Sequence, residues 1–151
     1  MKFVEDRGGK VVWHNRDIRK QKCFVSNSDA ALTGPLLSAH EHFENCMESI
    51  QSVSSPSNTS VFISISMNSV ASAYCPGVRN ASAVGLTSEE ILSICFCAGK
   101  DPNCSVIDIC EFVPEVEEIL TARLISEMIY YFLSGYYYRL SQKESRKSGR
   151  F

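Results

Sequence analysis

The sequence lacks the long apolar run, the one-sided charge and the paired cysteine motifs that would place it in several large protein classes. No apolar run approaches the roughly 20 residues of a membrane-spanning helix, and Met1–Arg7 holds no apolar signal region. Lys and Arg number 15 against 17 Asp and Glu, a net charge of −2. Neither nucleic acid nor an anionic membrane is therefore an expected partner. We expect a cytoplasmic protein.

The seven cysteines are an odd number and include no Cys-x-x-Cys pair, the spacing typical of structural zinc. Cys95 and Cys97 are close in sequence, but on a helix their sulfur atoms point roughly 200° apart. We expect most of the cysteines to be buried as small apolar side chains. Cys75 is the best candidate for a reactive thiol, yet its nearest basic neighbour is Arg79, so we expect it to be unreactive.

Short apolar runs alternate along the chain with patterns of helical period. The runs predict strands at Lys10–His14, Val61–Met67 and Ser105–Cys110. The helical patterns cover Leu36–Ile50, Leu86–Cys97 and Glu115–Leu140. This order predicts an α/β fold, a three-layer α-β-α arrangement with a mainly parallel sheet, incomplete at 151 residues. Residues 1–140 form this domain, and the polar, basic tail 141–151 is predicted to be disordered.

Two of the predicted helices carry further signals. Thr87 and Glu90 have the spacing of a capping box, Leu86 can pack on Ile91, and the helix is predicted to end before Gly99. The last helix has an apolar stripe that we place at Ala122, Ile125, Ile129 and Phe132. Its tyrosine-rich second half is explained by core packing or by a contact between subunits: Tyr130, Tyr131 and Tyr136–Tyr138.

The candidate site lies where the predicted strands end. Ser66 and Asn68 are two residues apart at the end of the central strand, so we expect both on one side of it. Glu111 directly follows the next strand. Asp108 lies inside that strand, where we expect it to be half-buried and to form an ion pair or a hydrogen bond to a loop. Ligands of open α/β sheets bind at the carboxyl ends of strands.

The three histidines do not suggest a metal site. His40 lies on the helical stripe that includes Phe43, Met47 and Ile50. His42 is two residues further along the helix and would face away from His40, so the two cannot share an ion. His14 belongs to a distant segment. We interpret all three as ordinary surface or core imidazoles.

Two ordered motifs resemble the ureohydrolase superfamily of arginase, agmatinase and formiminoglutamase. The first is Ser64-Ile-Ser-Met-Asn-Ser-Val70 with Pro76-Gly77-Val78 and Gly85-Leu-Thr87, similar to the family's Ser-x-Asp-x-Asp strand, Pro-Gly and helix start. The second is Asp108-Ile-Cys-Glu111-Phe-Val-Pro114 with Thr121-Ala-Arg123. The spacing is closer to formiminoglutamase than to animal arginase. The resemblance covers about residues 3–140, the carboxy-terminal half of a family domain.

The resemblance implies hydrolysis of a guanidinium or formimino carbon by a hydroxide that bridges two Mn²⁺ ions. Ser66 and Asn68 occupy the positions of two family aspartates, so the site loses two negative charges, and Glu111 matches a substrate-facing glutamate. Arg123 is interpreted as an anchor that pairs with Asp108, Glu111 or the backbone. With these substitutions we expect no cofactor and no confident catalytic residue.

Two functions remain open. In the first, the protein has lost the manganese site and acts by binding or assembly, as a homo-oligomer or with a related full-length chain. In the second, it hydrolyses formiminoglutamate or arginine with Mn²⁺, and an absent amino-terminal half supplies the remaining ligands. Any small ligand would be a guanidino or formimino amino acid.

Overall fold

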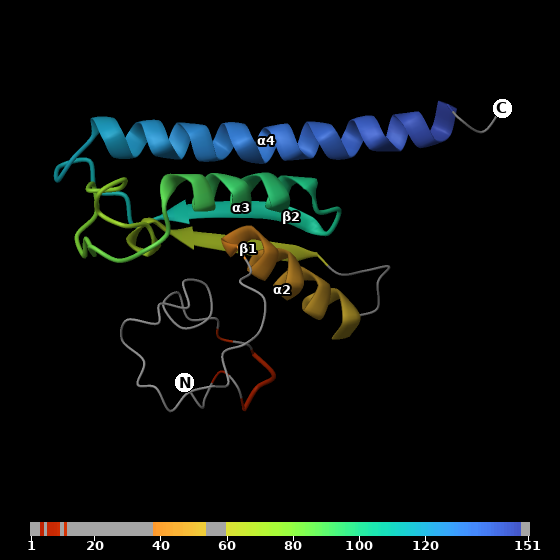
Figure 1. The fold of residues 1–151 in the computed structure, drawn as a ribbon, viewed down its shortest axis with the longest axis horizontal. Coiled ribbons are helices and arrows are strands. Elements are labelled where there is room, and N and C mark those ends of the chain that lie inside the picture. The colour runs from red at the N-terminus through yellow and green to blue at the C-terminus, as the bar shows by residue number, and fades with distance from the viewer. Residues whose placement is uncertain (1–3, 5, 10, 12–37, 54–59, 149–151) are drawn as a thin grey trace.

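A computed structural model describes residues 4, 6–9, 11, 38–53 and 60–148. The elements in chain order are helix α2 (Ala39–Val53), strand β1 (Val61–Ser66), the short 3-10 helix η3 (Met67–Ser69), helix α3 (Ser88–Lys100), strand β2 (Cys104–Cys110) and helix α4 (Ile119–Ser148) (Figure 1). Of the strand predicted at Lys10–His14 only Val11 is among the described residues, and His14 lies outside them.

Strands β1 and β2 pair in parallel, as the alternation of strands and helices predicted. Ile63 and Ile65 lie opposite Ile107 and Ile109 in the register, and this face of the sheet meets the helices. Apolar β-branched side chains on a pleated surface favour such a strand pair. The α/β class is therefore confirmed.

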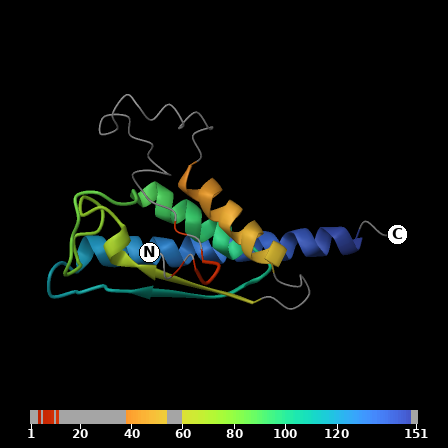
Figure 2. The same cartoon turned by 90° about the horizontal axis from the view of Figure 1, so that it is seen from below.

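The described helices cover one face of the two strands. Figure 2 shows α3 and α4 on the same side of β1 and β2, with α2 packed outside α3. The core between these layers contains Met67, Ile91, Cys95, Leu124 and Met128, all buried. On the opposite face, Phe62 pairs in register with Val106 and both side chains are exposed.

Helix α3 starts as predicted but continues further. The hydroxyl of Thr87 accepts from the Glu90 backbone N–H at 3.2 Å, and the Glu90 carboxylate accepts from Thr87 N–H at 2.8 Å. This capping box satisfies two otherwise free helix donors. The predicted end before Gly99 is wrong, because α3 includes Gly99 and Lys100. Gly99 lies against the backbone of α4, so its missing side chain permits close helix packing and does not end the helix.

Helix α4 differs from the prediction in its bounds and in its buried face. It begins at Ile119, four residues later than expected, where Glu117 accepts from the backbone N–H groups of Leu120 and Thr121. The prediction of a disordered tail from residue 141 is wrong up to Ser148, since the segment has no glycine or proline before residue 149 and the helix continues.

The buried stripe of α4 is rotated from the predicted one. Thr121, Leu124 and Met128 are buried. Of the predicted stripe, Ile125 and Phe132 pack against the core, whereas Ile129 is exposed. Apolar residues surround much of this helix, so periodicity alone did not identify the inner face. The small residues Thr121 and Gly135 define it, because they allow close contact with the loop before α3 and with α3 itself.

Candidate functional site

The parallel register brings the candidate residues to one edge of the sheet. Ser66 pairs with Cys110, so both strands end at the same level and Glu111 follows directly. Asn68 also lies at this edge, but not on the strand as predicted. The chain turns into η3 after Ser66, and Asn68 is the central residue of that 3-10 helix. Strand alternation therefore does not relate Asn68 to Ser66.

Asn68 is the most unusual polar group at this edge. Its side-chain oxygen Oδ1 is buried, and no hydrogen-bond partner reaches it within the described part of the chain. A buried carbonyl oxygen without a donor costs about 1–3 kcal/mol, so it is a site where a donor or a cation would be stabilised. Ser66 caps η3 only through its backbone oxygen, which accepts from the Ser69 hydroxyl at 2.7 Å.

Glu111 has the single positive φ angle among the described non-glycine residues, at 69°. The left-handed conformation costs an L-residue roughly 1–2 kcal/mol, and strained residues of this kind cluster at functional sites. Its side chain is exposed. The next residues return along the edge, where Val113 N–H donates to the Gly77 carbonyl at 2.8 Å. The structure thus places Glu111 at the rim of the sheet edge.

Asp108 lies on the uncovered face of β2. Its carboxylate accepts from the Ser64 hydroxyl at 3.0 Å, across the register pair of these two residues. Asp108 therefore does form a hydrogen bond, but with the neighbouring strand and not with a loop as expected, and its side chain is exposed and not half-buried. Arg123 is also exposed, and among the described residues it forms no ion pair with Asp108 or Glu111. Within the described residues no ion pair or hydrogen bond supports the predicted anchoring role, and Thr121 holds the loop there.

Thr121 joins the Pro76-Gly77 loop to the start of α4. Its hydroxyl accepts from Gly77 N–H at 2.8 Å and donates to the Glu117 carboxylate at 2.8 Å. The backbone N–H groups of Leu120 and Thr121, together with the Thr121 hydroxyl, hold the pKa of Glu117 below its ordinary value. A Cβ atom on Gly77 would lie 2.2 Å from the Glu117 carbonyl oxygen, so only glycine fits there. The second motif therefore has a structural role through Thr121.

Cys75 lies in the same loop and is fully buried. Burial raises the pKa of its thiol, as the sequence indicated for a cysteine without a basic neighbour. Burial also raises the pKa of Cys95 to about 12 and that of Cys97 to about 11. None of the described cysteines is in a disulfide. Four of them are buried: Cys75, Cys95, Cys97 and Cys104. The expectation of buried cysteines is confirmed for these.

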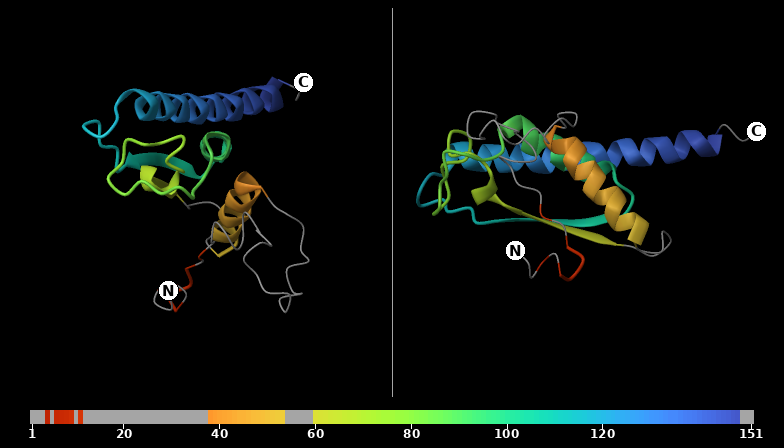
Figure 3. Two further views of the ribbon diagram at one scale, coloured as in Figure 1. Left: turned by 60° about the vertical axis from the view of Figure 1, so that its left-hand side comes forward. Right: turned by 60° about the horizontal axis from the view of Figure 1, so that its bottom comes forward.

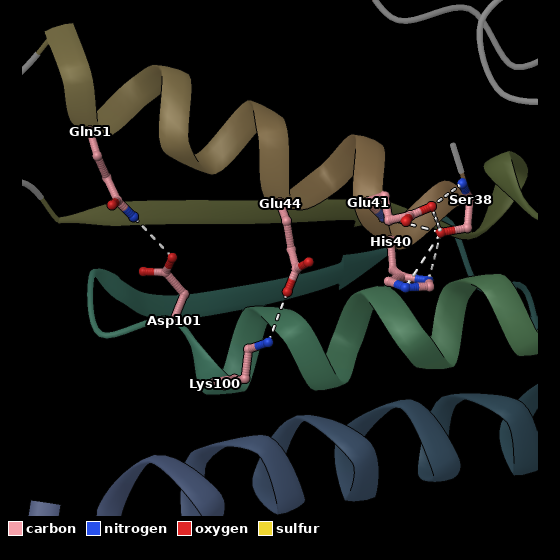
Figure 4. A network of polar contacts seen from close by, with 7 residues as sticks. All are labelled: Ser38, His40, Glu41, Glu44, Gln51, Lys100 and Asp101. Carbon is pink, nitrogen blue, oxygen red and sulfur yellow. Dashed lines mark hydrogen bonds and ion pairs between the residues drawn. The ribbon is translucent and has the colours of Figure 1, made fainter. Parts of the chain in front are cut away.

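A polar network between α2 and α3 was not predicted. Figure 4 shows Glu44 paired with Lys100 at 2.8 Å, and Gln51 donating to Asp101 at 2.9 Å. At the start of α2 the Ser38 backbone N–H donates to Glu41 at 2.6 Å. The Ser-x-x-Glu spacing of this cap was visible in the sequence, whereas the contacts between helices required the fold.

An open groove lies beside this network. His40 and Glu44 of α2 and Tyr131 of α4 line it, together with four residues of α3: Ser93, Phe96, Cys97 and Lys100. Its charged groups already pair with each other. In the described part of the chain no three or more His, Cys, Asp or Glu residues are grouped so as to hold a metal ion.

Comparison with known proteins identifies the family. A model of the arginase family matches residues 36–135. This chain belongs to the arginase family. No curated protein sequence matches the chain significantly. Within the described residues no helix combines the length and the apolar content needed to cross a bilayer.

Solved structures of this family share the fold. Formiminoglutamase from Trypanosoma cruzi, solved with Mn²⁺ among other forms, is 27% identical with a TM-score of 0.64, covering 89% of this chain and about 37% of its own. Formimidoylglutamase from Bacillus subtilis is 22% identical (TM-score 0.53), over 66% of this chain and 32% of that one. Arginase from Entamoeba histolytica, in complex with L-ornithine, is 18% identical (TM-score 0.54), over 64% of this chain and 34% of that one. The arginase-family chain thus spans well under half the length of these relatives.

Proposed function

We propose that this arginase-family chain holds no binuclear manganese centre of its own and acts by binding or assembly instead of by hydrolysis. The observation that carries the proposal is the pair of neutral side chains at the end of β1, Ser66 and Asn68. Mn²⁺ is a hard cation that prefers carboxylate and imidazole ligands. Two adjacent dications repel one another unless several anionic ligands offset their charge.

The donor set at the sheet edge supports this proposal. Asn68 offers one buried neutral oxygen, and Ser66 offers a hydroxyl that is uncharged at neutral pH. The carboxylate of Asp108 accepts from Ser64 on the uncovered face, and Glu111 is exposed at the rim. These residues do not fit a pair of Mn²⁺ ions.

The test compares metal content and turnover of two designed variants. The wild-type chain, Ser66→Asp/Asn68→Asp and Ala81→Asp/Ala83→Asp are each dialysed with Mn²⁺, and bound metal is measured by mass spectrometry. The control pair adds the same charge at the same spacing on an exposed loop. We expect negligible metal on the wild type and on the control, and at least about tenfold tighter Mn²⁺ binding by the Ser66/Asn68 variant.

Release of urea from arginine and of formamide from formiminoglutamate is measured on the same samples. We expect no turnover above blank for the wild type. Two tightly held ions per wild-type chain, or wild-type turnover above blank, would overturn the proposal.

The alternative is a hydrolase of formiminoglutamate or arginine whose other ligands come from sequence outside this chain. It is supported by the 27% identity to a formiminoglutamase and by the share of about 38% of that protein which the chain spans. Mixing the chain with a separately produced amino-terminal half of a family enzyme, followed by the same formamide and urea assays, tests it. Activity that appears only in the mixture supports the hydrolase.

A further inference from the structure

Helix α4 has a second apolar face that points away from the core. Its inner face includes the buried Leu124 and Met128. On the outside, four large apolar side chains follow one another: Tyr130, Leu133, Tyr137 and Leu140, exposed by 67%, 55%, 73% and 40%. Figure 3 shows α4 along the margin of the molecule, with no described helix or strand over its outer side.

The four outer residues form a regular seam. Their spacing of three, four and three residues is that of the a and d positions of a heptad, which pack against a neighbouring helix. From Tyr130 to Leu140 the seam is roughly 15 Å long. Contiguous exposed apolar surface of this kind marks an interaction site more often than single exposed residues do. The occupant that such a seam fits is another helix.

We propose that the occupant is α4 of a second copy of this chain, in antiparallel orientation. Ser126 and Glu144 continue the stripe, four residues before and four residues after the seam, and both are exposed. A parallel pair would place Glu144 beside the partner's Glu144, and like charges at such a position repel. An antiparallel pair centred on Gly135 places Glu144 opposite the partner's Ser126.

The same centre matches the apolar residues. Tyr130 then lies opposite the partner's Leu140, and Leu133 lies opposite the partner's Tyr137. Each tyrosine meets a leucine, so the large rings do not oppose each other. Such an isologous contact is closed by a two-fold axis, and it stops at two copies.

The available area is that of a concentration-dependent dimer. A buried tyrosine side chain contributes about 150–250 Å², and both seam tyrosines are at least two-thirds exposed. With the two leucines and the flanking Ile129, the seam supplies on the order of 500 Å² per copy, or roughly 1,000 Å² in total, the lower limit of specific interfaces. The inference rests on the proposed function only in naming a partner for assembly, and its test needs no metal.

The experiment measures the mass of the full chain by light scattering and sedimentation between about 1 and 200 μM. We expect a transition from 16.8 kDa to twice that mass. Leu133→Glu/Tyr137→Glu, and Tyr137→Glu alone, should weaken self-association at least about tenfold, because each buries a charge in the seam. Val84→Glu replaces an exposed apolar side chain outside the seam with a charged one, and it should leave self-association unchanged. Circular dichroism checks that the variants keep the wild-type helix content.

Orientation is tested by disulfide cross-linking in oxidising buffer, with the wild type as the baseline for its native thiols. Ser126→Cys/Glu144→Cys should form covalent dimers, whereas Ser126→Cys alone should not, because antiparallel copies hold these positions about 27 Å apart. A wild type that stays monomeric at about 200 μM, or seam variants that behave as Val84→Glu does, overturns the dimer. Cross-linking by Ser126→Cys alone overturns its orientation. Finding bound manganese changes none of these readings, so the two proposals fail separately.

Discussion

Gly99 of α3 and Gly135 of α4 are reciprocal contacts: each lies against the backbone of the other's helix. A Cβ atom on Gly99 would be 2.0 Å from the Phe132 carbonyl oxygen, and one on Gly135 would be 2.1 Å from the Phe96 carbonyl oxygen. The two helices therefore touch backbone to backbone at both points. Any side chain there must push the helices apart.

Gly99→Ala should consequently destabilise the protein, against the usual preference of helices for alanine. Alanine gains about 1 kcal/mol in helix propensity, but overpacking of this contact costs more, and we expect a net loss of about 2 kcal/mol. The midpoint temperature of thermal unfolding should then fall by about 5 °C. Ser126→Ala, at an exposed position of α4, is the control and should leave the midpoint unchanged or slightly higher. An unchanged Gly99→Ala midpoint would mean that the helices separate without cost.

The capping box of α3 predicts a second, smaller effect. Thr87→Ala removes the hydroxyl that accepts from Glu90 N–H, and the loss of such a cap costs about 1 kcal/mol. Thr87→Ser retains an acceptor and should lose only a few tenths of that. Urea unfolding of the three proteins measures the difference. Equal losses for alanine and serine would show that the methyl group matters and the hydroxyl does not.

The sequence predicts those parts of the structure that are determined by contacts between neighbouring residues. The capping box of Thr87 and the strands β1 and β2 follow from neighbouring residues, and they were predicted to within a residue or two. Gly99 read as a helix end because a glycine usually disrupts a helix, and only its contact with α4 explains why it does not.

The candidate site divides in the same way. The positions of Ser66 and Glu111 at one sheet edge follow from strand ends and the parallel order. Three other features depend on how the whole edge packs: the 3-10 turn that carries Asn68, the isolation of its buried Oδ1, and the positive φ of Glu111. The sequence indicates Thr121 only as part of a motif, because its bond to Gly77 joins residues that are 44 apart in sequence.

The positive φ of Glu111 predicts that glycine is preferred at this position for stability. Glu111→Gly should raise the free energy of unfolding by up to about 1 kcal/mol, because glycine adopts φ of 69° without the steric cost. Glu111→Ala retains a Cβ atom and should not stabilise, which makes it the matched control. Urea unfolding distinguishes the two. A glycine variant that is less stable than the alanine variant contradicts the argument from backbone strain.

Burial predicts which thiols react in the native protein. Cys46 and Cys110 are partly accessible, whereas Cys75, Cys95 and Cys97 are buried with raised pKa values. The thiolate is the reactive form, so alkylation at about pH 8 followed by peptide mass spectrometry should label the first two at least about tenfold faster. Unfolding in denaturant should equalise the rates. Fast native labelling of Cys75 would contradict its burial and restore it as a reactive candidate.

Glu117 predicts a pH dependence of stability. Donors from Leu120 and Thr121 lower its pKa in the folded protein below the value of 4.5 that it has without them. A lowered folded-state pKa stabilises the protein above the unfolded-state value, and this contribution is lost as the pH falls through the folded-state pKa. Glu117→Gln should therefore unfold at a lower temperature than the wild type near neutral pH, and the difference should shrink towards about pH 3.

The control is Glu118→Gln. It removes a charge at a neighbouring exposed position that lacks these bonds, and it should follow the wild-type profile. A difference between Glu117→Gln and the wild type that stays constant with pH would show that the carboxylate charge contributes nothing at the start of α4.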